Sequence, residues 1–313
     1  ENGFSAQSRM TVVNRTREKM KRLILYLNPG LQIHKLAESG RDISFLRDGQ
    51  AVVVERELNP GDSTVMEMVY GGKIDEDIYR VGVDNEAYFT PERQVDVERY
   101  GKRTAFVSRD YTLLIPEILW YPVAIPPTVL ETFREVDFTI YTLHVKNPDG
   151  LMVLSQGIPE KRQDGITFRN LQALTGLSLC FGNYERRSVM VDSITVEFYT
   201  YPGNDFYMQD FDKWMEKIAG DSNAEEYRNK LKNECRDAIE SEMPNLYPFK
   251  LLKIVEVPPS FLNSFSFKEN VQPEMVFFSE RMTGELDNPG DWLDVSQEDT
   301  DDVAYSLAQE ISN

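Results

Sequence analysis

The sequence predicts a mainly β N-terminal domain, an antiparallel sandwich or curved sheet, followed by an α+β segment. Two observations predict the β domain: many short stretches alternate between apolar and polar residues, and turn signals separate them at short intervals. Helical periodicity replaces this alternation after Pro202-Gly203. We therefore expect three regions: an antiparallel β domain at 1–203, a helical hairpin connector at 204–246, and an incomplete α+β segment at 247–313.

Hairpin and strand signals support the β domain. In ISFLRDGQAVVVERE, Asp48-Gly49 suits a two-residue type I′ turn between β-branched runs. The turn NPGDS then leads into TVMEMVYGG, a strand whose alternate residues should face opposite sides. Thr64, Met66, Met68 and Tyr70 would share one face, and Val65, Glu67 and Val69 the other. Further strands are expected in VDFTIYTLHV, GITFRNL, LSLCFG and SITVEFYTY.

The C-terminal third has a different pattern. Two amphipathic helices are expected within 204–246, and a capping box formed by Ser222 and Glu225 opens the second. Buried strands are expected in YPFKLLKIVEVP and QPEMVFFSE. Glu256, the one acid of the first of these, suits an edge strand, with a buried basic partner as the alternative. The closing stretch, DDVAYSLAQEISN at 301–313, has the apolar stripe of a helix.

Composition excludes several classes of function. The 313-residue chain carries 34 Lys and Arg against 52 Asp and Glu, a net charge of -18, which argues against nucleic-acid binding through phosphates. No run of 18 apolar residues is present, so no transmembrane segment is predicted. The opening ENGFSAQSRM lacks a hydrophobic signal core and an initial Met, which suggests a processed product or an excised piece.

Cysteines and histidines point to no metal or cofactor. Cys180 and Cys235 are expected as small buried hydrophobes, and whether they pair stays open. His34 and His144 lie in strand-like surroundings far apart in sequence. A catalytic zinc normally takes three protein ligands, so this pair does not make a zinc set. No Ser-His-Asp arrangement or glycine-rich phosphate loop is visible either.

Several stretches, in order, carry a family resemblance. They are LILYLNPGLQIHKL, ISFLRDGQAVVVERELNPGDSTVMEMVYGG, LIPEILWYPV, YPFKLLKIVEVP and VAYSLAQ. In this order and spacing the chain resembles the N-terminal and early catalytic region of the aminopeptidase N type of zinc metallopeptidase, the gluzincin aminopeptidases. The resemblance implies that residues 247–313 begin a thermolysin-like domain. It also places VAYSLAQ where the family has its zinc helix, Val-Ala-His-Glu-x-Ala-His.

Carried over by position, the chemistry of the family is missing. Tyr305 would replace the first zinc ligand, Ser306 the general base and Gln309 the second ligand. Neutral Tyr and Gln are poor zinc ligands, and a serine does not accept the proton of a metal-bound water as a carboxylate does. Glu269 and Asn270 match the end of the amine-binding loop of the family, whose Gly and Met are absent. An ordinary core helix and a solvated turn are the alternative readings.

The sequence therefore predicts a non-catalytic, aminopeptidase-like binding or scaffolding portion of a larger bacterial protein. A membrane-transport context and an extracytoplasmic or membrane-associated location follow from the resemblance alone. The expected partner is a protein, a peptide or the remainder of its own chain. Two alternatives stay open: the N-terminal part of an active zinc aminopeptidase whose metal site lies beyond residue 313, and a β-sandwich adhesion or assembly module.

Overall fold

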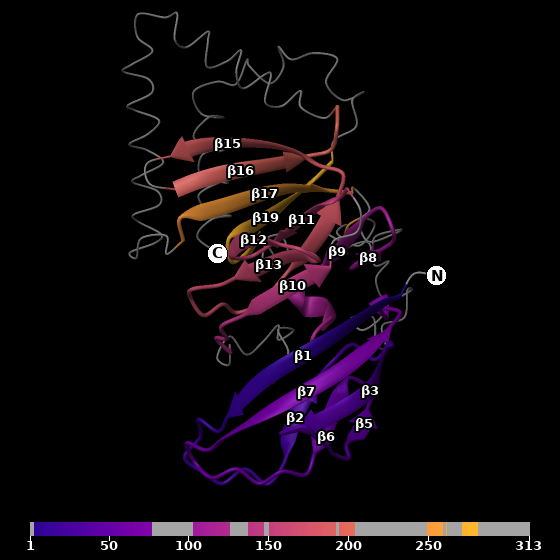
Figure 1. Cartoon of the computed structure of the whole chain (residues 1–313), viewed down its shortest axis with the longest axis vertical. Helices are drawn as coiled ribbons and strands as arrows, with labels where there is room; N and C mark the ends of the chain where they lie inside the picture. Colours follow the sequence, from indigo (N-terminus) through magenta and orange to yellow (C-terminus); the bar gives the residue numbers. More distant parts are fainter. Residues whose placement is uncertain are drawn as a thin grey trace, which may run out of the picture. The chain divides into compact units, whose positions relative to one another are not determined.

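The computed structural model of the chain is built mainly of β-strands (Figure 1), which fall into two compact units. Unit 1 is Glu1–Gly182 and unit 2 is Asn183–Asn313. The described residues are 3–76, 103–125, 137–146, 150–191, 194–203, 249–258, 261 and 271–280. In this part of the chain β-strands dominate, as the predicted fold class requires, and no helix is long and apolar enough to cross a membrane.

The first 76 residues form two antiparallel sheets. One sheet has the strand order β1-β7-β3-β4 and the other has the order β2-β6-β5. Buried side chains from both sheets, among them Leu25, Val52 and Met68, belong to one hydrophobic core cluster. The strands are β1 (Phe4–Val13), β2 (Leu23–Tyr26), β3 (Leu31–Glu38), β4 (Arg41–Asp42), β5 (Leu46–Asp48), β6 (Ala51–Val54) and β7 (Ser63–Gly72).

Strand β7 confirms the predicted alternation. Thr64, Met66, Met68 and Tyr70 are buried, whereas the residues between them are only partly buried. The β5–β6 hairpin also forms, but the predicted turn is wrong by one residue. Asp48 pairs with Ala51, so Gly49 and Gln50 make the loop. Of these two only Gly49 has a positive φ, 52°, whereas a type I′ turn needs positive φ at both central residues.

Residues 103–182 add two more antiparallel sheets to unit 1. Their strand orders are β11-β14-β9-β8 and β10-β13-β12. The strands are β8 (Phe106–Val107), β9 (Thr112–Leu114), β10 (Thr142–Lys146), β11 (Met152–Ser155), β12 (Ile158–Arg162), β13 (Gly165–Arg169) and β14 (Leu179–Gly182), with a 3-10 helix, η3, at Pro116–Ile118. Trp120 follows η3 and donates its indole N–H to the carbonyl of Leu177 at 3.0 Å, so buried hydrogen bonds fix this aromatic segment.

Unit 2 contains a five-stranded mixed sheet with the order β15-β16-β17-β19-β18. Its strands are β15 (Glu185–Val191), β16 (Ile194–Thr200), β17 (Leu251–Val257), β18 (Val271–Gln272) and β19 (Met275–Ser279). Strands β16 and β17 are parallel, as are β17 and β19. Both buried strands predicted after residue 247 are therefore present.

The observed sheet differs from two predictions made from the sequence. Strands β15 and β16 fall within the range predicted for the first domain, 1–203, yet they belong to unit 2 because β16 pairs along its length with β17. The edge-strand position expected for Glu256 is wrong, since β17 lies between β16 and β19. The helical connector at 204–246 and the final helix lie outside the described residues.

Candidate functional site

Unit 2 buries a lysine on the central strand of its sheet. Lys253 on β17 is only 2% exposed. Its neighbour on β16, in register, is Glu197, and its backbone N–H donates to the carbonyl of Glu274 at 2.8 Å. Burial lowers the pKa of Lys253 to about 8, while Glu274 and Glu197 act in the opposite direction. Lys253 therefore loses its proton more readily than an ordinary lysine does.

Glu197 joins this lysine to two further polar side chains. Its carboxylate accepts the phenol O–H of Tyr199 at 2.6 Å and an N–H of Arg186 at 2.6 Å. The alternation in TVEFYT puts Glu197 and Tyr199 on one face of β16, and Arg186 is the register partner of Tyr199 on β15. Burial, followed by the hydrogen bond to Glu197, raises the pKa of Tyr199. We call Lys253, Glu197, Tyr199 and Arg186 the lysine cluster.

The opposite face of β17 buries a second acid. Glu256 is fully buried, and its carboxylate accepts the backbone N–H of Tyr201 at 2.6 Å. Its own carbonyl accepts the O–H of Tyr184 at 2.9 Å. The rings of Tyr184 and Tyr201 stack with their centroids 5.2 Å apart. This carboxylate therefore ties the end of β16 to β17.

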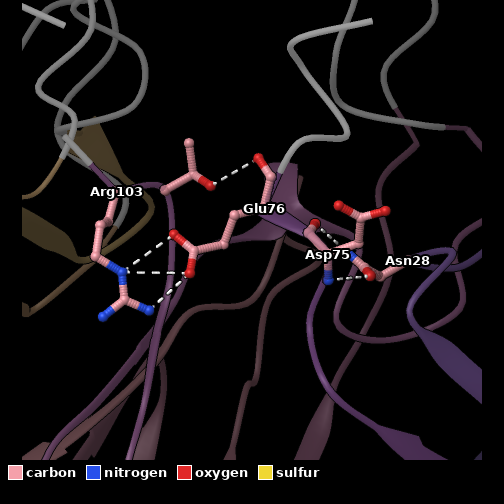
Figure 2. A network of polar contacts seen from close by, with 5 residues as sticks. Asn28, Asp75, Glu76 and Arg103 are labelled. Carbon is pink, nitrogen blue, oxygen red and sulfur yellow. Dashed lines mark hydrogen bonds and ion pairs between the residues drawn. The ribbon is translucent and has the colours of Figure 1, made fainter. Parts of the chain in front are cut away.

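Unit 1 contains a second polar network, built around an uncharged amide (Figure 2). Asn28 is fully buried and donates to the carbonyls of Asp75 and Ile118, each at 2.9 Å. Its side-chain oxygen accepts the N–H groups of Gly30 at 3.0 Å and of Asp75 at 2.8 Å. All four contacts are to backbone groups, so Asn28 fastens three chain segments together.

A surface ion pair lies next to this amide. Arg103 contacts the carboxylate of Glu76 at 2.6 Å (Figure 2). Its guanidinium lies 4.7 Å from the ring centroid of Phe106. Thr104 donates to the carbonyl of Glu76 at 3.3 Å. Because Arg103 is about half exposed, this ion pair contributes little to stability.

The described histidines do not form a metal centre. His34 lies at the register shift between Ile33 and Lys35 of β3. His144 on β10 contacts the hydroxyl of Thr167 at 2.9 Å and a carboxylate oxygen of Asp164 at 3.4 Å. Within the described ranges no group of three or more His, Cys, Asp or Glu residues could hold a metal ion. The described residues therefore do not fit a zinc site.

Every site residue predicted from the sequence lies outside the described part of the chain. This applies to Tyr305, Ser306, Gln309, Glu269 and Asn270. Cys180 is buried on β14, as expected of a small hydrophobe. Cys235 lies outside the described part of the chain, so the question of their pairing stays as the sequence left it.

The lysine cluster was missed by sequence reasoning. Two signals pointed to it: a lysine inside an apolar strand, and a glutamate that alternates with a tyrosine in TVEFYT. Neither signal says that strands β16 and β17 are adjacent.

Comparison with known proteins gives a fold. No protein-family model and no curated protein sequence matches the chain. Among solved structures, an M1 zinc metallopeptidase from Deinococcus radiodurans matches 82% of this chain with a TM-score of 0.54 and 17% sequence identity. The chain has the fold of M1 zinc metallopeptidases. Legionella pneumophila aminopeptidase A, solved in complex with aspartic acid, matches 88% of this chain with a TM-score of 0.54 and 11% identity.

The likeness to the M1 fold covers only part of each relative. The chain spans 53% of the Deinococcus enzyme and 28% of the Legionella enzyme. The resemblance to aminopeptidase N-type enzymes read from the sequence is confirmed at the level of fold. At these identities the comparison concerns the backbone arrangement and not the chemistry.

Proposed function

We propose that this chain is the non-catalytic, aminopeptidase-like binding or scaffolding portion of a larger bacterial protein. The observation that carries the proposal is the identity of three residues in VAYSLAQ. Tyr305, Ser306 and Gln309 occupy the positions that correspond, by the sequence resemblance, to the two histidines and the glutamate of the zinc helix. All three changes remove either a good zinc ligand or a general base.

The described side chains of unit 2 suit a framework. Glu197 already accepts two hydrogen bonds, and the carboxylate of Glu256 accepts a backbone N–H. Acids held in this way fix strands to one another rather than activate water. The M1 fold supplies the shape for this role, since scaffolding needs the arrangement of sheets but not the metal.

The partner and the location form part of the proposal. A protein, a peptide or the remainder of the same chain is the expected partner. An extracytoplasmic or membrane-associated position, reached through a longer parent chain, agrees with the resemblance described above. The acidic composition, with a net charge of -18, disfavours nucleic acid as the ligand.

The proposal is tested by zinc content and hydrolysis in the full-length natural protein, purified without chelator or metal-affinity resin. We expect less than about one tenth of a zinc per chain and no hydrolysis of aminoacyl nitroanilides, because two ligands and the base are replaced. The matched variant carries Tyr305→His, Ser306→Glu and Gln309→His together. It should gain zinc if this helix keeps the place of the zinc helix.

Tight binding of about one zinc by the unaltered protein, with hydrolysis, would contradict the proposal. It would favour an active aminopeptidase whose metal site lies beyond residue 313. A folded protein in which the triple variant also binds no zinc would show that residues 301–313 were placed wrongly on the zinc helix.

A further inference from the structure

The outer face of the sheet β2-β6-β5 carries an open groove of about 580 Å³. The inner face of the same sheet contributes Leu23, Leu25, Val52 and Val54 to the core of unit 1. The alternate residues point outward and line the groove together with the segment that precedes β5. The lining residues are Arg22, Ile24, Tyr26, Ser44, Phe45, Leu46, Asp48, Ala51, Val53 and Glu55.

Strand register arranges these outward side chains in rows. Val53 on the central strand pairs with Ile24 on one side and with Leu46 on the other. This middle row is apolar and accessible, since Ile24 is 40% exposed and Leu46 is 66% exposed. Exposed large apolar side chains gathered in one row across a sheet are the usual sign of a contact surface.

Charged and polar residues border the apolar row on both sides. Ala51 pairs with Tyr26 and with Asp48 in the row at one side. On the other side lie Arg22, just before β2, and Glu55, just after β6. Neighbouring rows on one sheet face are two residues apart along a strand, or about 7 Å. The groove thus presents an apolar centre with an acid on each side.

Charge selects the partner for this surface. The lining holds two acids, Asp48 and Glu55, against one base, Arg22. The lining itself therefore has a net negative charge, which favours a basic segment over an acidic one. A segment that matches the groove has an apolar side chain with a basic side chain about 7 Å away on either side. That distance corresponds to two residues of a strand or about four residues of a helix.

We infer that this groove binds a basic, amphipathic segment of a partner protein, with an apolar side chain over Val53 and cations near Asp48 and Glu55. The inference rests on the proposed binding or scaffolding function and names the chemistry of its partner. Apolar burial supplies the affinity, and the two acids set the orientation and the preference for a basic sequence.

The test uses the full chain and four labelled synthetic peptides, with binding followed by fluorescence anisotropy. In one peptide Lys, Leu and Lys are two residues apart, which suits a strand, and in another they are four residues apart, which suits a helix. Each has a matched control peptide, its Glu twin, that carries Glu in place of Lys. We expect at least one Lys peptide to bind and both Glu twins to bind at least about tenfold more weakly. Binding should weaken as salt rises.

Two matched variants locate the binding. Leu46→Asp should weaken it about tenfold or more, because it puts a charge in the apolar row. Leu171→Asp introduces the same change at a residue that is 81% exposed and lies outside the groove, and it should leave binding unchanged. Circular dichroism of both variants checks that the fold is kept.

Three results would overturn the inference: neither Lys peptide binds, the Glu twins bind equally well, or Leu171→Asp weakens binding as much as Leu46→Asp. Each of these is independent of zinc content and hydrolysis, which test the proposed function. A zinc-containing, hydrolytic full-length protein could still bind the Lys peptides at this groove, so the two failures are distinguishable.

Discussion

Unit 1 buries an uncharged amide, Asn28, whereas unit 2 buries a lysine and two glutamates on two adjacent strands. The amide costs little to bury because four backbone groups satisfy its hydrogen-bonding atoms. The ionisable groups of unit 2 lose more hydration on burial, and each needs its own partner. Loss of the Asn28 amide should therefore destabilise unit 1, whereas a change of pH between about 8 and 10.5 should act mainly on unit 2, through Lys253.

Replacing Asn28 should have the largest effect. In Asn28→Ala, buried backbone groups at Gly30, Asp75 and Ile118 lose their partner, and each unsatisfied group costs about 1–3 kcal/mol. We expect the free energy of unfolding to fall by about 3 kcal/mol or more, measured by urea denaturation. Asn59→Ala is the control, because Asn59 is exposed and bonds only within its own turn. Equal losses for the two variants would show that Asn28 does not fasten unit 1.

The stability of unit 2 should depend on pH through Lys253. Its pKa is about 8 in the folded chain and 10.5 as an ordinary lysine, so in this interval the unfolded chain holds the extra proton. The free energy of unfolding should therefore rise as pH increases through this interval, by about 3 kcal/mol in full. The stabilising contribution is present above pH 10.5 and is lost as pH falls to about 8.

Comparison with Lys253→Met isolates this dependence. Above about pH 10 the buried tyrosines act in the opposite direction, because burial raises the pKa of Tyr199 and raises that of Tyr70 to about 12. The buried tyrosines lower the stability of both proteins equally at high pH. The difference between the two unfolding free energies therefore reports on the lysine alone. A difference that stays constant between pH 8 and pH 10.5 would contradict the lowered pKa of Lys253.

The smallest effect is expected at the surface ion pair of unit 1. Arg103→Ala removes the contact with Glu76 and the stacking over Phe106, and it should cost less than about 1 kcal/mol because both partners are solvated. Thermal unfolding at low and high salt provides the measurement. Arg103→Lys keeps the charge but not the planar guanidinium, so its stability should lie between that of the unaltered protein and that of Arg103→Ala. A loss as large as that of Asn28→Ala would show that this charge stabilises unit 1 as much as the buried amide.

The strands could be predicted because alternation reports which side chains share a face. The buried set Thr64, Met66, Met68 and Tyr70 follows directly from the sequence of β7. Strand neighbours could not be predicted in the same way. Glu256 looked like an edge residue because an acid inside a central strand is rare, and only the pairing of β17 with β16 and β19 reveals its buried partners.

The candidate sites depended even more on tertiary contacts. The lysine cluster joins side chains from β15, β16 and β17. About fifty residues of chain separate the end of β16 at Thr200 from the start of β17 at Leu251. The groove required the register of three strands, which fixes the row of Ile24, Val53 and Leu46. The alternation of apolar and polar residues along a short stretch of sequence does not reveal either arrangement.

The parallel pairing of β16 with β17 has a consequence for aggregation. A shorter chain that ended before Leu251 would lack β17, and the edge of β16 that pairs with it would be left unpaired. The strand sequence ITVEFYT is rich in β-branched and aromatic residues and contains no proline. An open edge of this composition pairs readily with other chains. A truncation at residue 203, where the strand-like alternation of the sequence ends, should therefore give a protein that self-associates. A chain that retains β17 and β19 should self-associate less.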